Sequence, residues 1–186
     1  MKTIIINALL FQAGWLCCVL AGANHLPWLG TFTALLIVTW HLGNAIDARR
    51  ELLLILIAGT IGAIWDSLLV YAGWFMYPSG TLLAGTAPHW IVAMWLLFAT
   101  TLNVSLRWLK QRMLLSAVLG AVAGPAAYYA GYKLGGVLIT DLAIAMGSLA
   151  LGWALFMPLL MSLSNRLDGI KPAPLQAEPA GWSARV

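Results

Sequence analysis

Apolar stretches of about 20 residues recur along almost the whole of this sequence, with only short polar connections between them. An α-helix of that length rises about 30 Å, which is the thickness of the hydrocarbon core of a bilayer. Hydrophobic residues make up 62% of the 186 residues and charged residues only 9%. That charged fraction is too small to cover the surface of a water-soluble domain. The sequence therefore predicts an all-α, polytopic membrane protein.

Proline, glycine and charged residues divide the apolar sequence into six predicted transmembrane helices. These spans are residues 4–23, 28–46, 52–77, 88–107, 113–132 and 136–163. Residues 1–163 are thus predicted to form a six-transmembrane-helix bundle. Residues 164–186 are rich in proline and poor in apolar anchors, and we predict a disordered cytoplasmic tail there. The small residues 21–23 also resemble a signal-peptidase site, so cleavage of residues 1–23 stays open as an alternative.

The basic residues are distributed unequally between the two sides of this predicted layout. Lys133 is alone on one side, and nine basic residues share the other, namely Lys2, Arg49, Arg50, Arg107, Lys110, Arg112, Arg166, Lys171 and Arg185. Cytoplasmic loops carry such an excess, so we predict that both termini are cytoplasmic. The charged run 47–51 is expected to lie in water. Short basic runs between apolar spans orient a membrane protein and do not indicate nucleic-acid binding.

Two carboxylates fall inside the predicted spans. Asp66 is about 21 Å along the third span from its cytoplasmic end, and Asp141 is about a turn and a half into the sixth span from the outer side. Carboxylates within a membrane are costly and mark candidate functional sites. We expect Asp66, Asp141 and His89 to meet in the outer half of the bundle, with Lys133 pairing with Asp141. The structural alternatives are a hydrogen-bonded Asp66 that joins helices and an Asp141 that caps its helix.

A second polar set is predicted toward the cytoplasmic side. It consists of His41, Asn44 and Asn103, together with Asn7 and Gln12 of the first span. Interhelical hydrogen bonds explain such residues better than a binding site does. No histidine or acidic pair has the spacing of a metal site on one helix, and no nucleophile, phosphate-loop or dinucleotide motif occurs. We therefore expect no metal and no cofactor, and no motif supports an enzyme.

Small residues at four-residue spacing mark a packing face on the fifth span. Gly120 and Gly124 form one pair, and Gly131 and Gly135 form another. Such pairs allow two helix backbones to approach closely. They predict tight helix packing, either within the chain or between copies of it.

Several short motifs resemble those of an uncharacterised family of small bacterial inner-membrane proteins, a domain of unknown function. They are Trp65-Asp66, Pro88-His89-Trp90 followed by Trp95, the run 103–109, and the run 124–131. The resemblance covers the chain from the first span to about Leu163. It implies a multi-pass protein of the bacterial inner membrane. Genes of similar proteins lie beside genes for cyclopropane-type fatty-acid modification and for light or oxidative stress responses, but the family supplies no catalytic residue.

Three functions are left open by the sequence. The leading hypothesis is a non-enzymatic membrane protein that supports envelope or lipid homeostasis, with the bilayer, a lipid-modifying enzyme or a second copy of itself as partner. The second is a small proton-coupled transporter or permease that uses Asp66. The third is a membrane-embedded enzyme acting on lipid. A cavity near Asp66, and the polar groups that line it, would discriminate between them.

Overall fold

Residues 2–170 are described by the computed structural model, and within them the chain is mainly helical. The elements follow in the order α1 (Lys2–Ala23), α2 (Pro27–Gly43), α3 (Ala48–Tyr71), β1 (Phe75–Met76), α4 (His89–Leu102), η1 (Arg107–Leu109), α5 (Met113–Lys133), β2 (Leu138–Ile139) and α6 (Leu142–Arg166). The predicted all-α class and the number of helices are thus confirmed for this part of the chain. The remaining residues, including most of the predicted tail, lie outside the described range.

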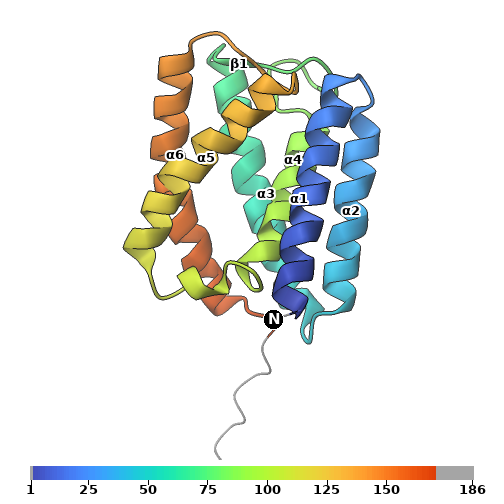
Figure 1. Cartoon of the computed structure of the whole chain (residues 1–186), viewed down its shortest axis with the longest axis vertical. Coiled ribbons are helices and arrows are strands. Elements are labelled where there is room, and N and C mark those ends of the chain that lie inside the picture. The colour runs from blue at the N-terminus through green and yellow to red at the C-terminus, as the bar shows by residue number, and fades with distance from the viewer. Residues whose placement is uncertain (1, 171–186) are drawn as a thin grey trace, which may run out of the picture.

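Figure 1 shows two groups of helices side by side. The hairpin of α5 and α6 forms one group. The other group contains the neighbouring helices α1 and α2 at its outer edge, and α3 and α4 lie between this pair and the hairpin. The two ends of the described chain lie at the same end of the bundle (Figure 1). We call it the basic end, because it includes Arg49, Arg50, Arg107 and Lys110. The opposite end, which includes β1 and β2, is called the strand end.

Four helices, α1, α3, α5 and α6, are long and apolar enough to cross a bilayer. Many of their large apolar side chains are exposed, such as Leu114 and Leu151, and large exposed apolar surfaces are typical of contact with lipid. α2 has 17 residues and α4 only 14, or about 25 and 21 Å of helix. The composition and these helices identify a membrane protein, but helix length alone accounts for four of the six predicted spans.

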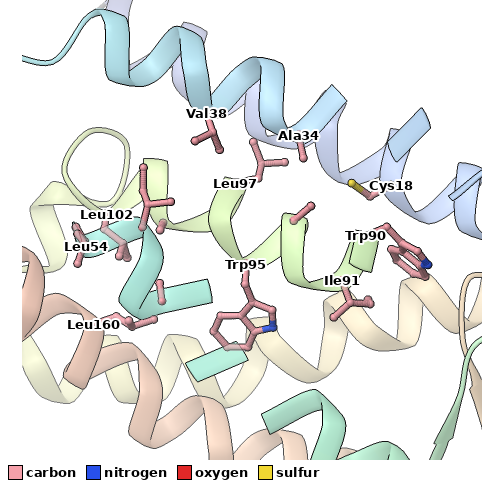
Figure 2. Packing of buried hydrophobic residues seen from close by; sticks show 14 of the residues in the cluster. Cys18, Ala34, Val38, Leu54, Trp90, Ile91, Trp95, Leu97, Leu102 and Leu160 are labelled. Atoms are coloured by element: carbon pink, nitrogen blue, oxygen red, sulfur yellow. The ribbon is translucent and has the colours of Figure 1, made fainter. Parts of the chain in front are cut away.

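α4 is the helix around which the bundle is built. It packs against α1, α2 and α3, and nine of its 14 residues are buried. A helix that is apolar on all sides is typical of such a central position. In Figure 2, Leu97 of α4 points toward Val38 and Ala34 of α2, whereas Trp95 points to the other side of the helix. α4 therefore joins the two groups of helices.

Gly120 and Gly124 lie against α6. A Cβ atom on Gly120 would be 2.3 Å from the carbonyl oxygen of Trp153, and one on Gly124 would be 2.3 Å from the Trp153 ring. These glycines therefore allow α5 and α6 to approach within the chain. Gly131 is also buried, close to Val137, whereas Gly135 has a φ of +82° and forms the turn after α5. Gly131 and Gly135 therefore contribute to the turn after α5 more than to a helix interface.

Several predicted boundaries differ from the structure. The third span was expected to reach Tyr77, but α3 ends at Tyr71, and Gly73 with a φ of +75° turns the chain into β1. β1 pairs antiparallel with β2, Phe75 opposite Ile139, and this short ribbon caps the strand end. α4 ends at Leu102, where residues 103–106 form turns. α6 continues to Arg166, so the predicted domain boundary at Leu163 falls inside a helix.

Candidate functional site

Asp66 lies in the last third of α3, five residues before the helix ends at Tyr71, and is completely buried. Both oxygens of its carboxylate accept a hydrogen bond. The indole Nε1 of Trp95 in α4 donates to Oδ2 at 2.6 Å, and the Tyr128 hydroxyl of α5 donates to Oδ1 at 2.6 Å. These bonds offset part of the cost of burying the carboxylate. Asp66 therefore connects α3, α4 and α5.

A third ring, that of Tyr77, completes the surroundings of this carboxylate. Its buried hydroxyl interacts electrostatically with Asp66. Among residues 2–170, no Lys, Arg or His side chain forms an ion pair with Asp66. The donors around the acid are thus neutral aromatic side chains, and no cation within the described chain balances its charge when it is ionised.

An apolar cavity of about 90 Å³ lies directly in front of these rings. It is formed between α1, α4, α5 and α6, and Tyr77, Gly136 and Val137 close it toward the strand end. Its walls are mainly aromatic, including Trp15, Tyr77, Trp90, Trp95, Tyr128 and Trp153. We call this cavity the aromatic pocket. Because Trp95 and Tyr128 both line it and both bond Asp66, the carboxylate lies immediately behind its wall.

Small residues and stacked rings give the aromatic pocket its space. In α5, Gly131 has no side chain and Ala127 only a methyl group, and Gly136 in the following loop likewise leaves space. The Trp95 and Trp153 rings stack with centroids 4.7 Å apart and planes 12° apart. This stack joins α4 to α6 on one wall and leaves the small residues on the opposite one.

The predicted cluster of Asp66, His89 and Asp141 does not form. His89 Nδ1 is 2.7 Å from the Thr31 hydroxyl of α2, and its ring stacks on Trp28 at 4.0 Å. Asp141 is exposed and caps α6 by accepting from the backbone of Ile144, which was the structural alternative for this residue. The predicted Lys133–Asp141 pair is also wrong, because the Lys133 ammonium lies over two tyrosine rings. Of the three, Asp66 alone contacts residues that line the aromatic pocket, Trp95 and Tyr128.

A second buried acid, Glu51, was missed by the sequence analysis, which placed the whole run 47–51 in water. Its side chain is 0% exposed. His41 Nε2 lies 2.8 Å from one carboxylate oxygen, and the other accepts from the Asn103 amide and, at 2.8 Å, from the backbone of Gly169. The sequence contained a weak signal of this burial, because Glu51 directly precedes the apolar residues of α3. In the structure, the two preceding residues, Arg49 and Arg50, remain exposed.

The remaining polar residues of the basic end extend this cluster. Arg107 forms two hydrogen bonds with Asp168, at 2.9 and 3.0 Å, and Lys110 reaches the same carboxylate at 2.8 Å. Asn44, in contrast, bonds only its own helix through the Trp40 carbonyl. Together, His41, Glu51, Asn103, Arg107, Lys110, Asp168 and Gly169 form what we call the polar clasp. The clasp fastens the segment after α6 to α3 and α4.

The first-span residue Asn7 also makes the interhelical bonds that the sequence suggested. Its amide nitrogen donates to the Thr100 carbonyl of α4 at 3.2 Å, and its oxygen accepts from the backbone of Ser105 at 3.3 Å. These contacts connect α1 to the end of α4. The role of Asn7 is structural, because both of its hydrogen-bond partners are main-chain groups.

Comparison with protein families gives one match, over residues 4–159, to a family described as protein of unknown function (DUF2878). The chain belongs to the DUF2878 family. The match includes every residue that lines the aromatic pocket, as well as Asp66 and Glu51, and it stops before the clasp residues that follow α6. The resemblance to an uncharacterised family is thereby confirmed. Neither the curated proteins nor the solved structures include a match to this DUF2878 chain.

Proposed function

We propose that this DUF2878 protein is a non-enzymatic membrane protein that supports envelope or lipid homeostasis by holding an amphiphile in the aromatic pocket. The observation that carries the proposal is the pocket itself, a cavity within a membrane bundle whose walls are apolar and aromatic. Ligand sites are typically concave, mostly apolar and equipped with few polar groups. An amphiphile dissolved in the bilayer could enter such a cavity laterally.

The chemistry of the pocket walls favours binding over catalysis. Of the described residues that line the pocket, none is a Ser, Thr, Cys, His, Asp, Glu, Lys or Arg, and the hydroxyls of its two tyrosines, Tyr77 and Tyr128, interact with Asp66. A membrane-embedded hydrolase or transferase needs a nucleophile or a general base within reach of the reacting atom. Asp66 is close, but Trp95 and Tyr128 occupy both of its oxygens and separate it from the cavity.

A proton-coupled transporter is the second candidate, and one observation favours it. Asp66 is a buried acid within an apolar helix and has no cationic partner among the described residues, and such acids often form proton or ligand sites. The sequence had assigned this role to Asp66 together with His89 and Asp141. Because those two residues lie elsewhere, a transport site would have to consist of Asp66 and the pocket alone.

The proposal is tested by filling the pocket. A Cβ atom on Gly131 would be 3.8 Å from Val137, an ordinary contact, so Gly131→Leu places its remaining atoms in free space at the pocket wall. Gly147→Leu is the matched control, because Gly147 is also helical and has nothing within 4 Å. Each variant and the wild type are purified in mild detergent, and retained lipids are identified by native mass spectrometry.

We expect the wild type and Gly147→Leu to retain the same amphiphile and Gly131→Leu to lose it. In a deletion strain that is sensitive to membrane or oxidative stress, Gly147→Leu should restore normal resistance and Gly131→Leu should not. Equal lipid retention and equal rescue by the two variants would show that the pocket has no part in the function.

A further inference from the structure

The aromatic pocket combines two features that seldom occur together in an apolar cavity. Its walls present the rings of several tryptophans and tyrosines, and a carboxylate without a cationic partner in the described chain lies behind one wall. We propose that the aromatic pocket binds an organic cation, specifically a trimethylammonium group. The inference rests on the pocket of the proposed function and adds the chemical class of its ligand.

The aromatic walls supply the first attraction. The face of an aromatic ring carries partial negative charge, so cations bind over it, most strongly over tryptophan, and quaternary ammonium ligands are commonly held in cages of such rings. Trp15, Trp90, Trp95 and Trp153 all line the pocket. Removal from water strengthens these contacts, and the pocket lies inside the bundle.

Asp66 supplies the second attraction through the same rings. Trp95 donates its indole N–H to the carboxylate, and Tyr128 donates its hydroxyl. Donation to an anion shifts electron density from the N–H or O–H group into the ring, which makes the ring face a better partner for a cation. The carboxylate also attracts the cation directly, over a short distance and through a medium of low dielectric constant. Both effects depend on Asp66 being ionised, and a bound cation stabilises the ionised form.

The lack of hydrogen-bond acceptors selects the type of cation. A primary ammonium brings three N–H donors and a guanidinium five, and each donor needs an acceptor when it is buried. Metal ions need several oxygen ligands. The lining consists of aromatic, aliphatic and glycine residues and Met94, whose sulfur is only a weak acceptor, and the Tyr77 and Tyr128 hydroxyls interact with Asp66. A quaternary nitrogen has no N–H group, and its methyl groups suit apolar walls.

The size of the cavity agrees with a compact headgroup. A volume of about 90 Å³ greatly exceeds the cavity volume of about 10–15 Å³ that one water molecule requires. It is too small for a whole lipid, so any attached chain must extend out of the cavity. The trimethylammonium group could belong to a small soluble molecule such as choline or to the headgroup of phosphatidylcholine.

The experiment compares a cation with a neutral molecule of the same shape. Choline and 3,3-dimethyl-1-butanol differ in one atom, nitrogen against carbon, and therefore in charge. Binding of each to the purified full-length protein in a maltoside detergent is followed by quenching of tryptophan fluorescence. We expect choline to bind at least tenfold more tightly than the neutral alcohol. For the lipid source, nanodiscs containing phosphatidylcholine or its 3,3-dimethylbutyl analogue are compared by the same signal.

Two variants separate the contributions of charge and ring. Asp66→Asn should reduce the preference for choline to about threefold or less while leaving the affinity for the neutral alcohol unchanged. Trp15→Leu removes one ring without touching the bonds of Asp66, and it should weaken choline binding about tenfold. If Asp66→Asn does not fold, the wild-type comparison and Trp15→Leu still decide the inference.

Equal affinity of the wild type for choline and for the neutral alcohol would overturn the cation site and leave the proposed lipid-binding function standing. If neither probe bound and no lipid were retained by the purified protein, both proposals would fall. A preference for choline but not for phosphatidylcholine over its neutral analogue would assign the site to soluble cations, and the opposite pattern would assign it to the lipid headgroup.

Discussion

Replacing Asp66 by leucine tests whether this acid holds three helices together. The substitution removes the acceptor of two buried donors, Trp95 Nε1 and the Tyr128 hydroxyl, each at 2.6 Å. Interhelical hydrogen bonds in membrane proteins contribute about 0.6 and at most about 1.7 kcal/mol each. A buried donor left without a partner costs about 1–3 kcal/mol. We therefore expect Asp66→Leu to lower the free energy of unfolding by about 1–4 kcal/mol.

Asp66→Asn keeps one oxygen acceptor and replaces the other by an amide that faces a donor, so we expect about half of that loss. The free energy of unfolding is measured by steric trapping in bicelles. Thr60→Val is the control, because the Thr60 hydroxyl is exposed and bonds only the Leu56 carbonyl of its own helix. That change should stay within about 0.5 kcal/mol of the wild type.

A double-mutant cycle adds a sharper criterion. In a Tyr128→Phe background, Asp66→Leu should cost less, because one of the two donors is already absent. If Asp66→Leu were as stable as Thr60→Val in the wild-type background, the two hydrogen bonds would not fasten α4 and α5 to α3. The packing of the aromatic rings would then hold these helices alone.

Three further predictions concern other parts of the molecule. Gly124→Leu should destabilise the bundle by about 1–3 kcal/mol or prevent folding, because its first side-chain atom would meet the Trp153 ring at 2.3 Å, whereas Gly147→Leu should melt like the wild type in detergent. Glu51→Leu should lower the melting temperature more than Glu51→Gln, since glutamine retains an acceptor for Gly169; equal melting of the two would argue against the clasp. A reporter fused after Arg166 should be active only if it is a cytoplasmic reporter, and periplasmic activity would refute the orientation inferred from the basic residues.

Sequence patterns were sufficient to predict where the helices lie, because hydropathy and segment length determine which parts of such a chain become helical. Chain segments of about 20 apolar residues must satisfy their main-chain groups internally, so each becomes a helix. Counting residues placed Asp66 about 21 Å along the third span, whereas in the structure it lies five residues before the end of α3. The helix ends were less predictable. α4 stops at Leu102, five residues before the end predicted for the fourth span, and the turn that follows places Asn103 against Glu51.

The partners of the two buried acids could not be predicted, for the same physical reason. Trp95 and Tyr128 are 29 and 62 residues from Asp66, and tryptophans that face lipid have the same local sequence pattern as those that face the core. Glu51 follows two exposed arginines, and its burial depends on Asn103 and Gly169, which are 52 and 118 residues away. Such contacts depend on how helices are arranged around α4, which hydropathy does not encode.

The polar clasp has a consequence for the way the protein is made. Glu51 leaves the ribosome early, but the backbone amide of Gly169 that binds it is synthesised 118 residues later. Arg107 and Lys110 likewise await Asp168. A nascent chain that has inserted α1 to α5 therefore contains Arg107 and Lys110 without Asp168 and Glu51 without the Gly169 amide, which is costly for charges that become buried. Completion of synthesis and closure of the bundle are thus coupled, and a chain released too early stays open to proteases that survey the membrane.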